Sequence, residues 1–98
     1  ILPLEAVGKL CKERGIFFLV DAAQSAGTLE VNYEALNADA IAFTGHKGLL
    51  GPQGIGGFII NDKAAAAVPP FICGGTGSDS ENEVQPEYMP DKFEAGTP

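Results

Sequence analysis

Lys47 is the residue whose type and position in the sequence most clearly suggest chemistry. It ends the stretch Ala42-Phe43-Thr44-Gly45-His46-Lys47, which follows an apolar run and leads into a glycine-rich loop. An amine held beside apolar walls has its charged form disfavoured and becomes a nucleophile that can bond to a carbonyl carbon. Because a lone lysine in such a loop more often points into solvent, the rest of the chain must decide between the two interpretations.

A second polar group follows an earlier apolar run. Residues 16–20 are all apolar, Asp21 comes directly after them, and Gln24 lies three residues further on. In open α/β sheets, ligands bind at the carboxyl ends of the strands, where both Asp21 and Lys47 would lie. An aspartate at such a position can equally cap the turn or helix that follows, so its residue type leaves both roles open.

Other chemistries are not favoured by the spacing. Gly45-His46-Lys47 lacks the residues that separate the first glycine from Gly-Lys in a Walker A loop, and Gly54-Ile55-Gly56-Gly57 precedes an apolar run of strand type instead of following one. His46 is the one histidine of the sequence, so a metal site is not expected. Ser25, His46 and Asp21 could form a nucleophilic triad on paper, but nothing in their spacing supports it.

The elements that must position these groups are predicted from the periodicity of the apolar residues. They are helices at residues 3–14 and 62–68 and strands at residues 16–20, 38–44 and 57–61. The first strand is a continuous apolar run, typical of a parallel sheet that is buried on both faces, and residues 38–44 are interpreted as a second buried strand. The third follows after a link too short for a parallel crossover, so we expect it to be antiparallel to the second. This order of elements predicts an α/β fold.

Local signals mark the ends of the two helices. Pro3 suits the first helical position of the first helix, and Gly15 offers a left-handed stop. Asp62 is the expected N-cap of the second helix, and Pro69-Pro70 ends it. Further along the chain the periodicity fades, and residues 79–92 are expected to form a loop that is ordered by contact with other segments.

Composition narrows the class of protein. Ninety-eight residues with 45% hydrophobic content fit one small domain, and a net charge of −7 argues against binding nucleic acid or an anionic membrane surface. No apolar run approaches the ~20 residues of a membrane span. Cys11 and Cys73 have no metal-ligand spacing, and reduced thiols in a cytoplasmic protein are the default expectation. Since the chain starts at Ile1 and stops at Pro98 within a turn-like phrase, we expect a part of a longer protein.

Two motifs taken together resemble the class V aminotransferase family. They are Asp21-Ala22-Ala23-Gln24 and Thr44-Gly45-His46-Lys47, with 26 residues from Asp21 to Lys47. The similarity is greatest to the cysteine desulfurase and selenocysteine lyase branch, and it covers the chain from Asp21 to Pro98. It continues in three further segments, Gly51-Pro52-x-Gly54-x-Gly56, Gly74-Gly75-Thr76-Gly77-Ser78 and Glu94-Ala95-Gly96-Thr97.

This family binds pyridoxal 5′-phosphate, and the resemblance implies a role for each matching residue. Lys47 would carry the cofactor as an internal aldimine, and Asp21 would face the pyridine nitrogen and keep it protonated. Gln24 would donate a hydrogen bond to the phenolic oxygen of the ring. His46 would complete the catalytic set with Lys47 and Asp21.

The resemblance also implies which residues meet the phosphate. Thr44, where the family more often has serine, and His46 would contact the phosphate or the surroundings of the ring. Thr76 and Gly77 would reach the phosphate that is bound in the partner subunit of a homodimer.

The implied fold is part of the three-layer, aspartate aminotransferase-like large domain, with a mostly parallel sheet and one antiparallel strand. Residues 1–98 would form a single partial domain from the centre of that cofactor-binding domain. The parent protein would be a cysteine desulfurase, which moves sulfur from cysteine to an acceptor protein.

An aminotransferase, a selenocysteine lyase or an epimerase of the same family remains an alternative, because the substrate-binding arginine and the sulfur-accepting cysteine would lie outside this chain. A truncated module that acts only through protein contacts is a further alternative. We expect the 98-residue chain by itself to be inactive.

Overall fold

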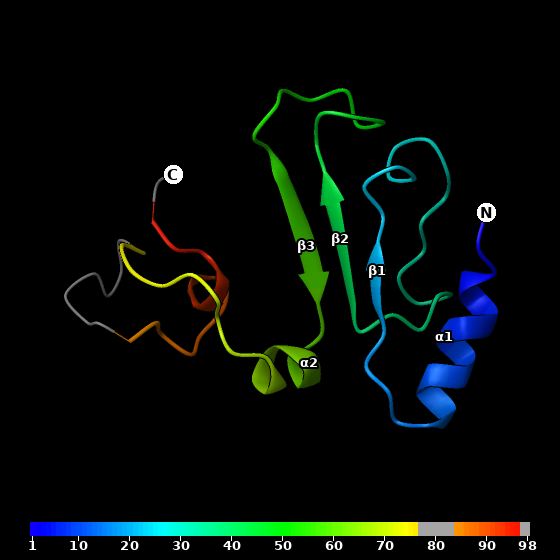
Figure 1. Ribbon diagram of the computed structural model, residues 1–98, viewed down its shortest axis with the longest axis horizontal. Coiled ribbons are helices and arrows are strands. Elements are labelled where there is room, and N and C mark those ends of the chain that lie inside the picture. Colours follow the sequence, from blue (N-terminus) through cyan, green and yellow to red (C-terminus); the bar gives the residue numbers. More distant parts are fainter. Residues whose placement is uncertain (77–83, 97–98) are drawn as a thin grey trace. The chain divides into compact units, whose positions relative to one another are not determined.

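The computed structural model describes residues 1–76 and 84–96 of the chain. Its elements are α1 (Leu4–Glu13), β1 (Leu19–Asp21), β2 (Ala40–Thr44), β3 (Gly56–Ile60), α2 (Asp62–Ala67) and the 3-10 turn η1 (Asp91–Phe93) (Figure 1). The chain divides into two compact units, Ile1–Ala64 and Ala65–Pro98. In the part of the chain that is described, no helix has the length and apolar character needed to cross a membrane.

The first unit is built on a three-stranded sheet in the order β1-β2-β3. β1 runs parallel to β2, with Asp21 opposite Ala42. β3 runs antiparallel to β2, with Gly56 opposite Thr44. The α/β class and the antiparallel third strand, both predicted from the sequence, are confirmed.

The core of this unit lies on one face of the sheet. Alternation along the paired strands places Val20 of β1 and Ile41 of β2 on that face, where both are buried. Partly buried apolar side chains from α1, from the connecting segment and from the strands pack against this core: Leu4, Phe18, Ala26, Val31, Tyr33, Leu36 and Phe43. This burial stabilises the sheet by roughly 1.5–3 kcal/mol for each large side chain that is removed from water.

The prediction that the first strand spans residues 16–20 is wrong, because β1 spans Leu19–Asp21. β1 begins only at Leu19, because the chain at Phe18 bonds to Asp39 outside the regular ladder. Val20 is 5% exposed, whereas Leu19 on the opposite face is 67% exposed. An apolar run therefore identifies the strand, but within the described residues only one of its faces is covered.

In both helices the N-cap residue lies one position away from the predicted one. Pro3 is the N-cap residue of α1 and not its first helical residue. The cap of α2 is Asn61, whose side-chain Oδ1 accepts a hydrogen bond from the Ala64 N–H at 2.7 Å. The prediction of Asp62 as the cap is thus wrong. Its carboxylate lies in the first turn, where it interacts favourably with the positive end of the helix dipole.

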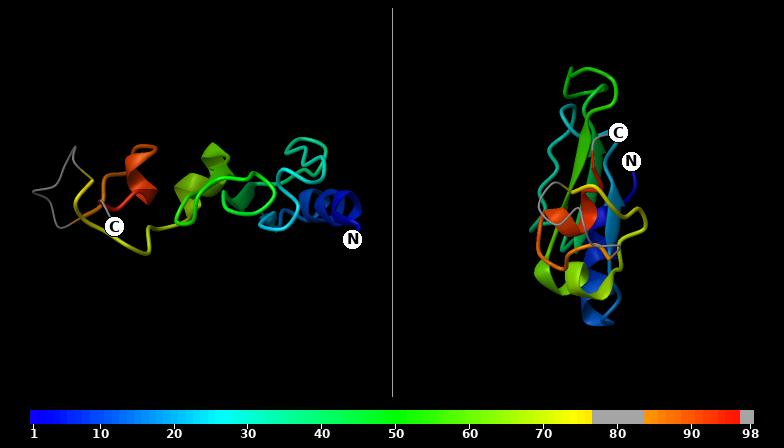
Figure 2. Two further views of the ribbon diagram at one scale, coloured as in Figure 1. Left: turned by 90° about the horizontal axis from the view of Figure 1, so that it is seen from above. Right: turned by 90° about the vertical axis from the view of Figure 1, so that its left-hand side faces the viewer.

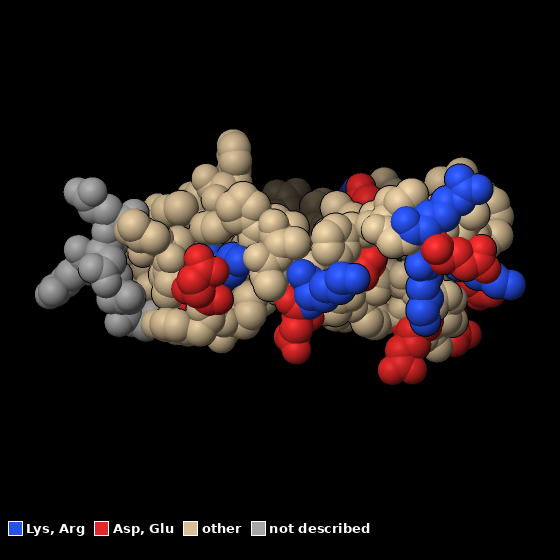
Figure 3. Space-filling view, turned by 90° about the horizontal axis from the view of Figure 1, so that it is seen from below, with Lys and Arg blue, Asp and Glu red and all other residues tan. Residues whose placement is uncertain are grey.

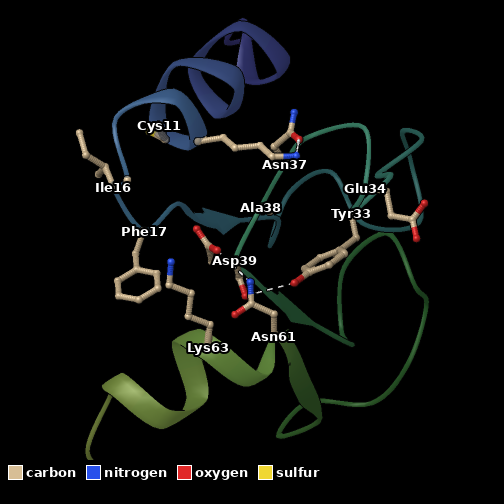
Figure 4. A pocket seen from close by; sticks show the side chains of 12 residues that line it. Cys11, Ile16, Phe17, Tyr33, Glu34, Asn37, Ala38, Asp39, Asn61 and Lys63 are labelled. Carbon is tan, nitrogen blue, oxygen red and sulfur yellow. Dashed lines mark hydrogen bonds between the residues drawn. The ribbon is translucent and has the colours of Figure 1, made fainter.

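Asp39 joins the ends of all three strands. Its Oδ2 accepts from the Phe18 N–H and its Oδ1 from the Asn61 side-chain amide, both at 2.8 Å, and its carbonyl accepts from the Asn61 N–H at 2.9 Å (Figure 4). Phe18 precedes β1, Asp39 precedes β2 and Asn61 follows β3. This network holds the register that sets Asp21 opposite Ala42 at the other end of the sheet.

Two buried polar side chains organise the second unit. Lys92 is 3% exposed; its Nζ donates to the Ala65 carbonyl at 2.6 Å and lies 3.4 Å from the Glu87 carboxylate. Gln85 is 5% exposed and bonds to three backbone groups. Of the loop predicted for residues 79–92, residues 79–83 lie outside the described part. The described residues 84–92 include Asp91 and Lys92, the first two residues of η1.

Candidate functional site

The carboxyl ends of β1 and β2 lie at the same edge of the sheet, since the two strands are parallel (Figure 1). Asp21 is the last residue of β1, Thr44 is the last residue of β2, and Lys47 follows three residues later. In the side view of Figure 2, the loop after β2 lies at one end of the strands and the start of α2 at the other. The structure therefore gathers the polar residues of both predicted motifs at one end of the first unit.

The pairing also sets which face the polar side chains occupy. Because Asp21 is opposite Ala42, and because side chains alternate along a strand, Asp21 and Thr44 share one face. That face is the one opposite the buried Val20 and Ile41. A carboxylate and a hydroxyl thus project on the same side, away from the core.

The loop that carries Lys47 is held by its own backbone. The Leu50 N–H donates to the Lys47 carbonyl at 2.9 Å, and the Gly51 N–H donates to the Gly45 carbonyl at 2.7 Å. The Gly45 N–H in turn bonds to the Ile55 carbonyl at 2.7 Å. Lys47 is half-buried in this turn, and the backbone hydrogen bonds of the loop hold its position.

The loops after β1 and β2 are in direct backbone contact. A Cβ atom built at Gly27 would overlap the carbonyl group of Gly48, and one built at Gly48 would overlap the carbonyl oxygen of Ala26. Only residues without a side chain permit this approach. The contact fixes the Lys47 loop against the turn that contains Asp21 and Gln24.

Asp21 uses one of its two carboxylate oxygens within its own turn. Oδ1 accepts a hydrogen bond from the Ala23 N–H at 2.9 Å, and the side chain is exposed. The turn-capping role that the sequence left open is therefore present. A ligand role stays compatible with it, because a carboxylate can accept several hydrogen bonds at once.

Thr44 and His46 form a hydrogen-bonded pair, with 2.8 Å between Thr44 Oγ1 and His46 Nδ1. Thr44 is half-buried and His46 is exposed, so the hydroxyl at the strand end holds the imidazole of the loop. The other ring nitrogen, Nε2, is not engaged by Thr44. One donor of the pair is used in this bond, which leaves the other for an anionic group at this edge of the sheet.

The remaining predicted residues belong to the second unit. Thr76 lies in the described segment that follows Gly74 and Gly75, and Gly77 lies outside the described residues. Gln85, which no sequence motif indicated, bonds to Gly74 at the start of this segment. A single buried glutamine has no signature in the sequence, so only the structure reveals it.

A hollow of about 490 Å³ lies at the opposite end of the sheet and contains none of the predicted site residues (Figure 4). Its lining includes Asp39 and Asn61, which are already bonded to each other, and Lys63, whose ammonium lies 6.0 Å from the Phe17 ring centroid. Figure 3 looks onto this end, where acidic and basic side chains are interleaved over α1. Across residues 1–76 and 84–96, no cluster of three or more His, Cys, Asp or Glu could hold a metal ion.

Known proteins resemble this chain along its whole length. Residues 1–98 match the family model described as Aminotransferase class-V. A probable cysteine desulfurase of Pyrococcus abyssi (strain GE5 / Orsay) is 48% identical over 103 residues, which cover 100% of this chain and 25% of that protein. The chain therefore spans about a quarter of the length of this relative.

Two solved structures share the fold at TM-scores of 0.80. One is the apo structure of cysteine desulfurase from Thermococcus onnurineus NA1, at 44% identity over 98% of this chain and 24% of that one. The other is the cysteine desulfurase CsdA of Escherichia coli, at 31% identity with the same coverage. The fold is thus the predicted α/β fragment, and the chain belongs to the class V aminotransferase family, in its cysteine desulfurase branch.

Proposed function

We propose that this chain is the central part of the cofactor-binding domain of a cysteine desulfurase that uses pyridoxal 5′-phosphate. One observation carries the proposal: Asp21 ends β1, Lys47 lies in the loop after the neighbouring parallel strand β2, and the segments that follow the two strands are in backbone contact at Gly27 and Gly48. Family membership and the identity to a probable cysteine desulfurase support the same reaction class.

The residues at this edge fit the chemical groups of pyridoxal 5′-phosphate. Among the described residues, no hydrogen bond or ion pair engages the Lys47 amine, which leaves it available to an aldehyde. When bound, the cofactor supplies an electron sink for negative charge at the α-carbon of an amino acid. Lys47 would hold it through the amine nitrogen, and the Asp21 carboxylate would stabilise a proton on the ring nitrogen.

Hydrogen-bond donors would hold the rest of the group. Gln24, exposed at the same edge, would donate its amide N–H to the phenolic oxygen. One proton of the Thr44–His46 pair is used in the bond between the two side chains, and the remaining donor of the pair would donate to a phosphate oxygen. Thr76 and Gly77 would serve the site of the partner subunit in a homodimer.

The proposed substrate is cysteine, with sulfur passing to an acceptor protein. Residues 1–98 correspond to about a quarter of the relative. We therefore propose that the chain by itself is inactive, because charge-assisted hydrogen bonds each contribute about 1.5–3 kcal/mol and the remaining donors would come from other parts of the protein.

The test is borohydride reduction of the full-length protein with pyridoxal 5′-phosphate, followed by peptide mapping. We expect the label on Lys47 and its loss in a Lys47→Arg variant. Lys63 and Lys92 are internal controls, since the first lies beside Phe17 at the other end of the sheet and the second is buried against Ala65. A label on either would overturn the assignment.

The reaction is tested with the same protein. Cysteine should yield alanine and transferable sulfur, whereas transfer of an amino group to a 2-oxo acid would identify an aminotransferase instead. Preference for selenocysteine over cysteine would identify a selenocysteine lyase. The intact mass of the natural protein shows directly whether this chain is part of a longer one.

A further inference from the structure

Gln85 is a buried polar side chain for which the proposed function has no role. It is 5% exposed, and its amide is bonded at both ends. A buried amide that reaches several segments fixes their relative positions, because each broken bond would leave a buried polar group unpaired. The segments that it joins therefore indicate what it holds in place.

The amide of Gln85 bridges three backbone positions. Its Oε1 accepts a hydrogen bond from the Gly74 N–H at 2.8 Å. Its Nε2 donates to the Asp91 carbonyl and, at 3.4 Å, to the Glu94 carbonyl. One side chain thus ties the start of the glycine segment to both ends of the 3-10 turn region.

The two segments are also in backbone contact with each other. The Gly96 N–H donates to the Gly74 carbonyl at 2.8 Å. A Cβ atom built at Gly96 would overlap the Gly75 carbonyl, so the two segments approach more closely than a side chain would permit. Residues 74–76 and 94–96, which both belong to segments that resemble the family, therefore form one pair of loops.

We infer that Gln85 is a positioning residue that holds residues 74–76 against residues 94–96, in the arrangement in which Thr76 meets the cofactor phosphate. This inference rests on the proposed function, in which Thr76 meets that phosphate. The Gly74 N–H bonds to Gln85 and the Gly96 N–H to the Gly74 carbonyl, so these two groups hold the loops together and do not themselves meet the phosphate. If the loops were not ordered in advance, their ordering would reduce the affinity.

Two buried side chains of the same unit provide a matched comparison. Gln85→Met keeps the volume and removes all three bonds of the amide, whereas Lys92→Met removes a buried polar group whose bonds go to Ala65 and Glu87. In the full-length apo protein, we expect faster amide hydrogen exchange at residues 74–76 and 94–96 in Gln85→Met only. This measurement needs no cofactor.

The second measurement compares the affinities of the apo protein for pyridoxal 5′-phosphate and for pyridoxal, which lacks the phosphate. Gln85→Met should lower the preference for the phosphorylated compound about tenfold, the expected effect of losing charge-assisted bonds. Lys92→Met should lower the melting temperature and leave the preference unchanged. An unchanged preference in Gln85→Met, or an equal loss in both variants, would overturn the inference.

A further variant keeps the test decisive if Gln85→Met does not fold. Gln85→Glu retains an acceptor for the Gly74 N–H and removes the donors to Asp91 and Glu94. It should speed exchange at residues 94–96 and lower the same preference, and unchanged values would contradict the inference. If the wild-type protein itself shows no preference for the phosphorylated compound, the proposed function fails instead, whatever the exchange data show.

Discussion

Gly27 and Gly48 lie back to back where the loop after β1 meets the loop after β2. A Cβ atom at either position would overlap backbone atoms of the other loop, and Gly27 also has a φ angle of 84°. Two loops that are distant in the sequence thus meet at backbone distance. This contact connects the turn of Asp21 to the loop of Lys47.

Gly27→Ala should therefore destabilise the protein more than Gly54→Ala. Gly54 has a similar φ angle of 82° and no atom within 4 Å of a built Cβ, so it isolates the conformational cost of about 1–2 kcal/mol. Overlap at Gly27 should add about 1–3 kcal/mol. Thermal unfolding of the two full-length variants measures the difference, and equal losses would show that the two loops can separate freely.

Asp21→Asn should lower turnover of cysteine by orders of magnitude while the fold stays intact. An asparagine oxygen can still accept the Ala23 N–H bond that holds the turn, so this substitution removes only the charge. Asp21→Ala removes both the charge and the acceptor of the Ala23 N–H bond, so it should also lower the melting temperature. Steady-state kinetics together with thermal unfolding of both variants would expose a purely structural role, since turnover in Asp21→Asn would then stay close to normal.

Exchanging the two residues of the Asp39–Asn61 pair should destabilise the protein less than replacing either residue alone. Asp39→Asn leaves one oxygen for two donors, Phe18 N–H and the Asn61 amide, at a cost of about 1–3 kcal/mol. In the D39N/N61D variant each donor again faces an acceptor, including the Ala64 N–H, which the side chain of residue 61 caps. We expect the double variant to be more stable than the sum of the single effects predicts.

Asp39→Asn also removes one negative charge from this end of the sheet, and Asp62→Asn is the control for the loss of that charge. It removes a carboxylate from the first turn of α2 and should cost only about 0.3–1 kcal/mol. Urea unfolding of the wild-type protein, Asp39→Asn, Asn61→Asp and the double variant supplies the double-mutant cycle. Additive effects would mean that the network does not couple the strand ends.

Thr44→Ser should retain the affinity for pyridoxal 5′-phosphate, and Thr44→Val should weaken it about tenfold. Serine preserves the hydroxyl that lies 2.8 Å from His46 Nδ1, whereas valine keeps the shape and removes it. Equilibrium titration of the apo protein measures both. Equal affinities for the two variants would show that the hydroxyl is not used.

Sequence periodicity by itself determined the class of the fold and the edge of the sheet at which Asp21, Thr44 and Lys47 lie. Apolar runs before Asp21 and Thr44 identified two strands, and the short link after Lys47 was sufficient to predict an antiparallel β3. These features depend on neighbouring residues and on chain length, which are local properties. The assignment of cofactor roles to Lys47, Asp21 and Gln24 stays a prediction.

Only the tertiary structure decided which contacts position that edge. The carboxylate of Asp39 bonds to residues 21 and 22 positions away, and Gln85 bonds to a glycine 11 positions away. Asn61 and not Asp62 caps α2, and the pairing of β1 with β2 begins only at Leu19. Such hydrogen bonds and burial depend on which segments the fold brings together, and no spacing along the chain encodes them.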